Sequence, residues 1–495
     1  LADGQAVCGH LSEISLDGKM QLDGGSLDTN LSIERLDANG GQMTVEAVYA
    51  DDSKNLKLDM RLSEPEDGLF VNLLNIEGAP PVALAVAGDG PISDIVLQLA
   101  FDVRAQRVLT GRMELTPGTQ GTNLNARLTG PLASILPRQH RPFFGESSDL
   151  QLAAVLQNSG AVDIPAVRLR GGNLNAEGRA ALLPDGFLTA LQLDLNILPT
   201  SGTTVLLPVA GGDTRIKGAR VNIGYDAQRQ GGWTASLVAS GIEHEGNRIA
   251  DATLVASGTM SDVNNALQRR IDFATRGHLQ GLEFTDPGVD EAFGDSVRLT
   301  GNGEWKAGAP VELQALQIGS KAFGLAAAGK LSGLAYDGNI NLSLNQLRGF
   351  SALAGRDLSG QARLNLTGMI DLLQGQFDLS MQGRARNIEL GTDTVDKLMA
   401  GDVLLAGKIA RTETGLAFER FRIGGAQFNT LVDGRFSSKD ANLQAQAQIY
   451  DLAAIDRRAK GPVAVGLQLR GQQSPFDLTS SIAMQSGNLL GRRAE

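Results

Sequence analysis

The most constraining feature of the sequence is a period-two alternation of aliphatic and polar residues, because a β-strand places successive side chains on opposite faces. Residues 191–197 alternate four aliphatic side chains with Gln192, Asp194 and Asn196. The pattern recurs at 340–344 and 443–449, and long stretches lack the three- and four-residue spacing of an amphipathic helix. It predicts an all-β chain with one aliphatic face. The residues expected to line that face are Leu191, Leu193, Leu195, Ile197, Ile340, Leu342, Leu344, Leu443 and Ile449.

Glycine-containing turns separate these strands. The dipeptide Asp-Gly tolerates the positive φ of tight hairpin turns. It occurs at Asp17-Gly18, Asp67-Gly68, Asp185-Gly186, Asp337-Gly338 and Asp433-Gly434. We expect hairpin turns at Asp185-Gly186 and Asp337-Gly338, since each lies between two apolar runs. Strands joined this closely must be antiparallel. A parallel β-helix would show a short, constant coil length, which we do not find.

An internal repeat organises the chain. Three segments begin at Phe144-Gly145, Phe293-Gly294 and Ala400-Gly401, and each contains a Val/Leu/Phe-x-Leu/Ile-x strand followed by a further glycine. The first and last glycines are 33, 35 and 33 residues apart (Gly145 to Gly178, Gly294 to Gly329, Gly401 to Gly434). This spacing predicts one elongated sheet built in modules, with bounds 1–144, 145–293, 294–400 and 401–495.

Short helices are expected between the modules. Asp286-Pro287 combines an N-cap with proline at the first helical position, and apolar residues follow at helical spacing. Thr392-Asp393 offers a second N-cap before a similar apolar run. We therefore predict helices over 286–293 and 393–400, closed by Gly294 and Gly401. In the first repeat, the apolar patch from Leu136-Pro137 to Phe144 is the equivalent segment.

Composition excludes several classes of protein. A hydrophobic content of 42% argues against disorder, and 61 glycines with only 4% aromatic residues suit many turns and aliphatic layers. A net charge of −11 without a dense basic block argues against a nucleic-acid partner. Cys8 is the single cysteine, so an internal disulfide is impossible. No apolar run reaches the ~18–20 residues of a transmembrane helix. The chain begins and ends within the pattern, so we expect it to be a piece of a longer protein.

No catalytic constellation emerges, and we do not expect an enzyme or a cofactor. The segment Gly324–Lys330 matches the start of a phosphate-binding loop, but Leu331 stands where Ser or Thr must hold Mg²⁺. We expect a strand there and no nucleotide. His10, His140, His244 and His278 lack a second His or Cys at metal-ligand spacing. Glu243 and Glu245 flank His244, but alternate strand residues face opposite sides. Acidic residues are spread without a clustered pair, and Trp233 and Trp305 lie in strand-like runs.

Several short motifs resemble the AsmA-like superfamily, and within it the TamB family. They include Leu128-Thr129-Gly130-Pro131-Leu132, Arg141-Pro142-Phe143-Phe144-Gly145, Gly88-Asp89-Gly90-Pro91-Ile92-Ser93-Asp94 and the run from Asn387 through Gly401. The resemblance covers nearly the whole chain, and the order and repetition of the motifs carry it. The N-terminal anchor helix and the C-terminal domain of that family are not recognisable in this sequence.

The resemblance implies a β-taco, which is a long U-shaped sheet with an apolar inner face that spans the periplasm of a Gram-negative bacterium. It implies transport of phospholipid, whose acyl chains would lie on that face, and a role in outer-membrane protein assembly. An inner-membrane anchor and an outer-membrane partner of the TamA type would involve parts absent here. The competing hypothesis is a purely structural β-repeat, such as an adhesin stalk, with its interior filled by its own side chains. A carbohydrate-active β-helix enzyme would need a clustered carboxylate site, which we do not find.

Overall fold

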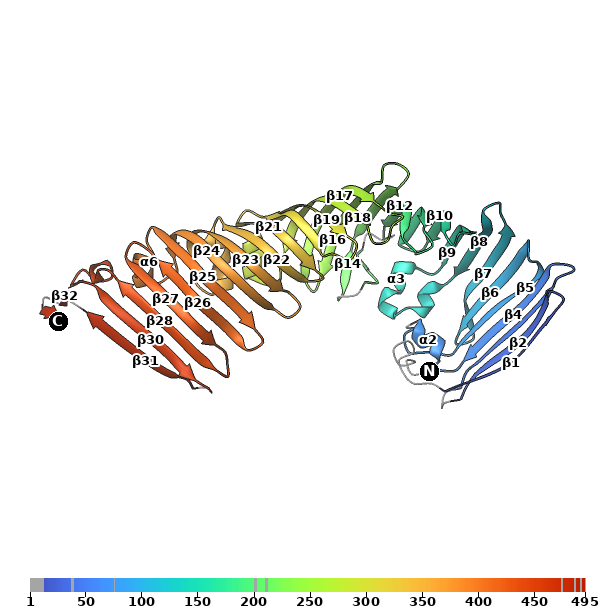
Figure 1. Cartoon of the computed structure of the whole chain (residues 1–495), viewed down its shortest axis with the longest axis horizontal. Coiled ribbons are helices and arrows are strands. Elements are labelled where there is room, and N and C mark those ends of the chain that lie inside the picture. Colours follow the sequence, from blue (N-terminus) through green and yellow to red (C-terminus); the bar gives the residue numbers. More distant parts are fainter. Residues whose placement is uncertain are drawn as a thin grey trace. The chain divides into compact units, whose positions relative to one another are not determined.

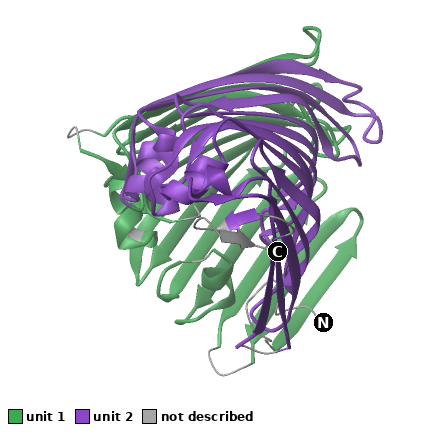
Figure 2. Ribbon diagram, turned by 90° about the vertical axis from the view of Figure 1, so that its left-hand side faces the viewer, with its two compact units in different colours: residues 1–245 green, residues 246–495 purple. Residues whose placement is uncertain are grey.

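The computed structural model describes residues 13–36, 40–74, 76–199, 203–209, 212–472, 475–484, 487–489 and 492–494. The chain is all-β, as the alternation predicts. Thirty strands belong to one open antiparallel sheet, and three short strands form a second one. The chain divides into two compact units, residues 1–245 (unit 1) and residues 246–495 (unit 2) (Figure 2).

Each strand of unit 1 pairs with the strand before and after it, so this part of the sheet is an antiparallel meander (Figure 1). Its strands are β1 (Ile14–Asp23), β2 (Ser26–Arg35), β3 (Gln42–Ala50), β4 (Asn55–Glu64), β5 (Val82–Pro91), β6 (Ile95–Val103), β7 (Gln106–Pro117), β8 (Gly121–Gly130), β9 (Ser148–Gln157), β10 (Val162–Arg170), β11 (Leu174–Leu182), β12 (Leu188–Ile197), β15 (Gly218–Asp226) and β16 (Gly232–His244). Two short strands, β13 (Val205–Leu206) and β14 (Thr214–Ile216), lie in the connection from β12 to β15, and β14 pairs with β16.

Unit 2 repeats the arrangement. Its strands are β17 (Asn247–Ser261), β18 (Arg270–Glu283), β19 (Ser296–Lys306), β20 (Val311–Gly319), β21 (Phe323–Ser332), β22 (Ala335–Leu344), β23 (Ser359–Asp371), β24 (Gln376–Glu389), β25 (Asp402–Thr412), β26 (Gly415–Gly424), β27 (Phe428–Phe436), β28 (Ala441–Ile449), β30 (Val463–Gly471) and β31 (Asp477–Met484). Again each pairs with its chain neighbours. The second sheet contains β29 (Ala459–Lys460), β32 (Gly487–Leu489) and β33 (Arg492–Ala494).

The described helices all interrupt the same edge of the meander within each unit. In unit 1 they follow β4 and β8, and in unit 2 they follow β18, β22, β24 and β28. They are α2 (Leu69–Leu73), η1 (Leu132–Ile135), η2 (Arg138–His140), α3 (Arg141–Phe144), α4 (Pro287–Phe293), η3 (Leu347–Phe350), α5 (Ser351–Ala354), α6 (Asp393–Leu398) and η4 (Leu452–Ala454). Connections of an antiparallel meander alternate between its two edges, so these positions share one edge. We call it the helical rim, and the opposite edge, made of short loops, the hairpin rim.

The strand register gathers the aliphatic residues onto one face, which we call the apolar face. Residues opposite each other in an antiparallel pair share a face, so a row can be followed from strand to strand. In unit 1 one row contains Gly18, Leu31, Val45, Met60, Val86, Leu99, Gly111, Leu128, Leu150, Leu169, Ala176, Leu195, Val221 and Leu237. In unit 2 one row contains Leu254, Gly277, Leu299, Ile318, Leu325, Leu342, Leu364, Gly383, Leu405, Ile423, Thr430, Ala447, Val465 and Ile482.

At the glycines of the apolar face, neighbouring side chains occupy the room that a larger side chain would need. A Cβ added at Gly277 would meet Leu254 Cδ1 at 3.2 Å and Leu299 Cβ at 3.5 Å. Gly338 lies under the ring of Tyr336, whose hydroxyl oxygen would be 2.7 Å from an added Cβ. That hydroxyl donates to the carbonyl oxygen of Ala328 or Asn339, at 2.9 and 2.8 Å. Tyr336 therefore covers backbone that glycine leaves bare.

The sequence repeat has a structural counterpart. Each copy consists of a short helix, a strand, a strand with a β-bulge and a strand with a glycine beside that bulge. The bulges lie between Ile164 and Val167 in β10, between Leu313 and Leu316 in β20, and between Phe418 and Phe421 in β26. Their glycine partners are Gly178, Gly329 and Gly434. The division into two units falls at Glu245, inside the second predicted module, and leaves the four module boundaries a prediction.

The predicted helices form, with one difference in length. Asp286 caps α4, because its carboxylate accepts the backbone N–H groups of Gly288 and Val289, and Gly294 ends the helix. Thr392 is the N-cap of α6, but that helix ends at Leu398 rather than at Gly401. The reason is that the carbonyl of Gly401 already accepts the N–H of Asn387, so the chain has returned to the sheet by that residue.

Three of the five Asp-Gly dipeptides named in the sequence analysis are not turns. Asp185-Gly186 forms the predicted hairpin turn, with Gly186 at φ 80°. Asp337-Gly338 was expected to form one, but it lies inside β22, and Gly333-Leu334 makes the turn instead. Asp17-Gly18 and Asp433-Gly434 are also strand residues, in β1 and β27. At these places glycine allows neighbouring strands and side chains to approach its backbone closely on the apolar face. The Asp-Gly pattern alone does not distinguish a turn glycine from a strand glycine of this kind.

We predict that Gly338→Ala lowers the free energy of unfolding by about 1–3 kcal/mol, because the new methyl group meets the Ala328 carbonyl and the Tyr336 hydroxyl. The matched control is Gly324→Ala in the neighbouring strand, where an added Cβ has no heavy atom within 4 Å. It should change stability by less than about 0.5 kcal/mol. Chemical denaturation followed by circular dichroism measures both, and equal effects would contradict this account of the glycines.

Candidate functional site

All nine residues predicted to line the aliphatic face lie on the apolar face. Leu195 and Leu342 belong to the rows described above, and the other seven follow from strand alternation in β12, β22 and β28. Eight of the nine are half-buried, so each keeps part of its side chain accessible. Ile197 differs, since only 8% of it is exposed. It lies under the connections of the helical rim, away from the open part of the face.

The apolar face carries no charged side chain between its two rims in the described strands. The exceptions lie at the margins. Arg35 and Glu64 end β2 and β4 at the helical rim, and Arg411 lies near the hairpin end of β25. The polar members of the face are a few hydroxyl and aromatic residues, such as Thr275 and Thr430. Ionised groups in apolar surroundings are strongly unfavourable, and between the rims this face offers them no charged partner in the described strands.

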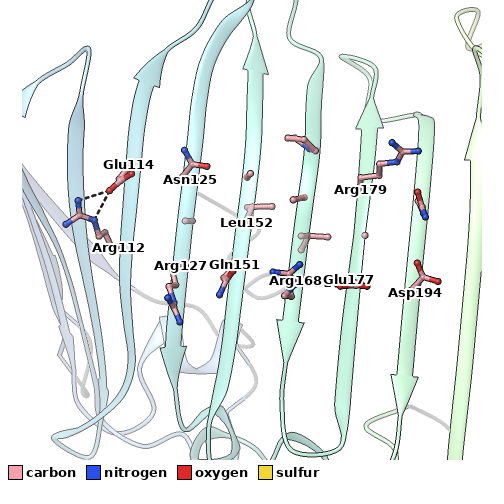
Figure 3. A pocket seen from close by; sticks show the side chains of 17 residues that line it. Arg112, Glu114, Asn125, Arg127, Gln151, Leu152, Arg168, Glu177, Arg179 and Asp194 are labelled. Carbon is pink, nitrogen blue, oxygen red and sulfur yellow. Dashed lines mark hydrogen bonds and ion pairs between the residues drawn. The ribbon is translucent and has the colours of Figure 1, made fainter.

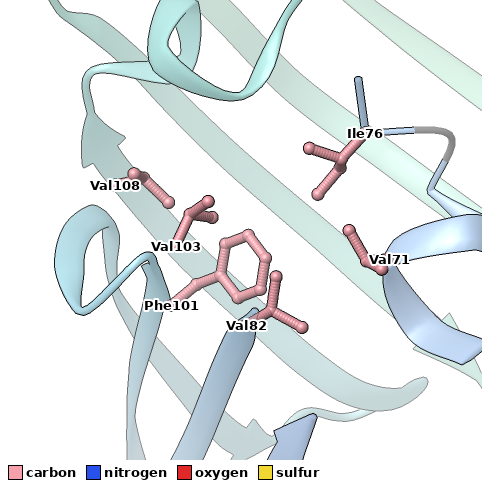
Figure 4. Close-up of a cluster of buried hydrophobic side chains, with 6 residues drawn as sticks. All are labelled: Val71, Ile76, Val82, Phe101, Val103 and Val108. Carbon is pink, nitrogen blue, oxygen red and sulfur yellow. The ribbon is translucent and has the colours of Figure 1, made fainter. Parts of the chain in front are cut away.

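Segments of the helical rim cover part of the face. Around α2, the side chains of Val71 and Ile76 pack against Val82, Phe101 and neighbours from the strands (Figure 4). The rings of Phe70 and Phe101 meet edge to face, with centroids 6.0 Å apart. The carboxylate of Glu64 accepts the N–H of Phe70 at 2.8 Å, which fixes the start of α2.

The same construction recurs along the rim. Phe143 of α3 packs with Leu174, Ile197, Val205 and Ile216 in unit 1. In unit 2, Leu347 of η3 and Met399 beside α6 pack against Ala385 and Val403. Figure 2 shows the sheet of unit 2 curling around its helices. Helical insertions therefore sit on the apolar face, and their own apolar residues anchor them there.

Two aromatic residues on the apolar face of unit 1 have polar atoms without a hydrogen-bond partner. Tyr225 and Trp233 are cross-strand partners in β15 and β16. The Tyr225 hydroxyl and the Trp233 indole nitrogen are both buried without a hydrogen-bond partner. Burial raises the pKa of the Tyr225 hydroxyl, and nearby Asp226 raises it further. This hydroxyl therefore stays protonated at neutral pH. From the sequence, Trp233 was interpreted as a packing residue in a strand-like run, and Tyr225 was not singled out.

The polar face carries ion pairs, some within one strand and some between neighbouring strands. In unit 1 it contains a hollow of about 570 Å³ over β7–β12 (Figure 3). Small residues line it, among them Ala166 at the bulge of β10 and its partner Ala153 in β9, together with long polar side chains. Arg112 contacts Glu114 at 2.6 Å, and Arg127 contacts Asp149 at 2.8 Å. The hydrogen bond from Arg127 is the main reason that the pKa of Asp149 is lowered. Both acids are therefore paired with a neighbouring cation on this face.

The other chemical motifs of the sequence have structural explanations. Gly324–Lys330 lies within β21, which confirms the predicted strand. His244 contacts the Thr214 hydroxyl at 3.0 Å through Nδ1. Among the described residues, no group of three His, Cys, Asp or Glu side chains could hold a metal ion. His10 lies outside the described residues.

Sequence reasoning missed two kinds of residue at this face. It did not place Gly111, Gly277 and Gly383 in the aliphatic rows, because that position follows only from the register of six strand pairs. It also did not anticipate that Phe143 covers Ile197. The motif around Phe143 was visible as an apolar patch, but its contact is with a strand more than fifty residues away.

Accessibility of the face can be measured by cysteine labelling in a Cys8→Ser background. We predict that Leu193→Cys reacts readily with a maleimide. Ile197→Cys should react at least about tenfold more slowly, because α3 and β13 cover this position. Both should react equally in denaturant. Equal rates in the folded protein would contradict the cover over Ile197.

No described helix combines the length and the apolar character that crossing a membrane requires. Comparison with protein-family models, curated proteins and solved structures gave no match.

Proposed function

We propose that this chain binds lipid acyl chains on its apolar face and carries phospholipid along it. The observation that supports this most directly is the aliphatic row of each unit, which runs through every main strand and contains no charged residue. Most of its members are half-buried or exposed, with Val86 and Gly111 as buried exceptions, so an acyl chain has accessible surface to lie on. A lipid could move from strand to strand without leaving apolar contact.

The energetic reason is the cost of taking acyl chains through water. Moving about 16 methylene groups from an apolar medium into water costs on the order of 13 kcal/mol, at ~0.8 kcal/mol per group. A continuous aliphatic surface removes most of this cost. With strands about 4.8 Å apart, the fourteen main strands give each unit a path on the order of 60 Å long.

The resemblance to the AsmA-like superfamily extends the proposal. On that basis we propose that the intact protein lies in the periplasm, anchored in the inner membrane, with a role in outer-membrane protein assembly beside a TamA-type partner. The motifs that carry the resemblance lie at the rims and turns, and Arg141–Gly145 includes the helix α3 that covers part of the apolar face. Localisation and partners remain proposals that rest on those motifs.

A purely structural repeat is the alternative, and it requires an interior filled by the protein's own side chains. In the described residues, side chains from the helical rim join three of the four buried apolar clusters, and the fourth is formed by strands alone. Exposed apolar residues remain on the face, such as Leu254 at 37%. A stalk would gain nothing from leaving them accessible, which favours the lipid-carrying function.

Photo-crosslinking tests the proposal in living cells. A crosslinker placed at Leu193 should capture lipid, whereas one at Gln192 should not, because strand residues alternate between the two faces. The same comparison applies to Leu342 and Asn341 in unit 2. Adducts are identified by mass spectrometry. Equal capture at Leu193 and Gln192, or capture at neither, would refute the proposal and leave the structural repeat.

Charge substitution gives a second test. Leu193→Arg should reduce lipid loading of the purified protein by roughly tenfold or more, because an unpaired charge then lies among the acyl chains. Gln192→Arg adds the same charge to the polar face and should have little effect. Circular dichroism and expression level must first show that both variants are folded. If a folded Leu193→Arg protein loads lipid as well as wild type, the path does not run over Leu193.

A further inference from the structure

The segment from Pro131 to Phe144, which joins β8 to β9 and contains η1, η2 and α3, is unusually basic for this chain. It carries Arg138, His140 and Arg141 and no Asp or Glu, although the whole chain has a net charge of −11. Three prolines limit its backbone freedom. A positively charged segment in an acidic protein requires a local explanation.

The segment is fixed on the apolar face. Ile135 packs against the cluster around α2, and Phe143, which is 4% exposed, packs into the cluster with Ile197. The connection between β10 and β11 also holds it. Asn173 donates from its side chain to the Pro142 carbonyl at 2.5 Å and from its backbone to the Phe143 carbonyl at 3.1 Å. Figure 1 shows α3 beside β9 and β10.

The cations of this segment have no acidic partner among the described residues. Arg138 and Arg141 are exposed, and Arg141 donates through Nε to the carbonyl of Leu136 at 3.2 Å. The Nδ1 atom of His140 is buried without a hydrogen-bond partner. Arginines on the polar face differ, since Arg127 forms a close ion pair with Asp149. Within the described part of the chain, the positive charge of this segment is therefore uncompensated where it crosses the apolar face.

A ligand that matches this arrangement carries an anionic group attached to apolar chains. Half-buried leucines of β8 and β9, including Leu128, Leu150 and Leu152, flank the segment on the apolar face. Guanidinium groups bind phosphate oxygens through paired hydrogen bonds. We propose that Arg138 and Arg141 bind the phosphate of a diacyl lipid whose chains lie on the apolar face of unit 1. This inference rests on the function proposed above and adds the chemical class of the lipid.

The test compares two ligands that differ only in phosphate. Phosphatidic acid and diacylglycerol with identical labelled acyl chains are presented from cyclodextrin to the purified full chain, and the protein-bound label is measured. For the double variant Arg138→Gln/Arg141→Gln, phosphatidic acid loading should fall about three- to tenfold, as expected for the loss of two exposed charge contacts. Diacylglycerol loading should not change. Salt should reduce phosphatidic acid loading of wild type only, because the contact is ionic.

Two controls isolate the site. Arg363→Gln removes one exposed positive charge from the polar face of β23 and should leave both lipids unaffected. Glycerol 3-phosphate, which has the phosphate without the acyl chains, should not compete at the concentration of the lipid. Effective competition would identify a site for free phosphate and overturn the proposal.

The remaining outcomes separate this inference from the proposed function. If wild type loads both lipids equally and the double variant does too, the apolar face binds acyl chains and the phosphate contact is refuted alone. If the double variant loses both lipids to the same extent, the segment acts only as a structural cover, which also refutes the contact. If wild type loads neither lipid, both proposals fail together.

Discussion

The structure depends on a register that keeps two chemically different faces apart over every main strand. A one-residue shift in pairing would move the aliphatic side chains of a strand to the polar side. Cross-strand contacts within each face, such as Leu128 with Leu150 on the apolar side and Arg127 with Asp149 on the polar side, oppose such a shift. The continuity of the aliphatic rows, the position of the helices and the proposed lipid path all follow from this register.

The β-bulges show how the register survives irregularity. In β10, Ile164 and Val167 both belong to the apolar face although three positions separate them. The bulge between them contains the extra residue. The apolar positions therefore move from even to odd residue numbers, but their side chains stay on the same face. The bulges of β20 and β26 do the same at the equivalent place of their repeats. The bulges therefore interrupt the period-two alternation in the sequence but keep the aliphatic side chains on one face of the sheet.

Sequence reasoning was most successful where one strand or one helix contained all the information. Alternation placed Leu191 and Leu193 on one face, and the capping pattern located α4 from Asp286 to Gly294. It was wrong at Asp337-Gly338, because glycine also serves where Tyr336 needs space. It did not find the cover over Ile197 or the placement of the basic segment, since both depend on contacts between distant parts of the chain. The apolar and polar sides of a strand could be predicted from the sequence, but the segments that cover its apolar side could not.

The confinement of all helical insertions to one rim has a consequence for how such a chain can change in length. Adding a hairpin, which is two strands, returns the chain to the same rim, so every later insertion keeps its side. Adding a single strand would exchange the rims for all residues that follow and would place α4 or α6 at the opposite edge. An insertion ahead of a helix therefore keeps that helix on its rim only if it adds an even number of strands. Within each unit, the hairpin of two strands is therefore the smallest insertion that leaves the later helices on the same rim.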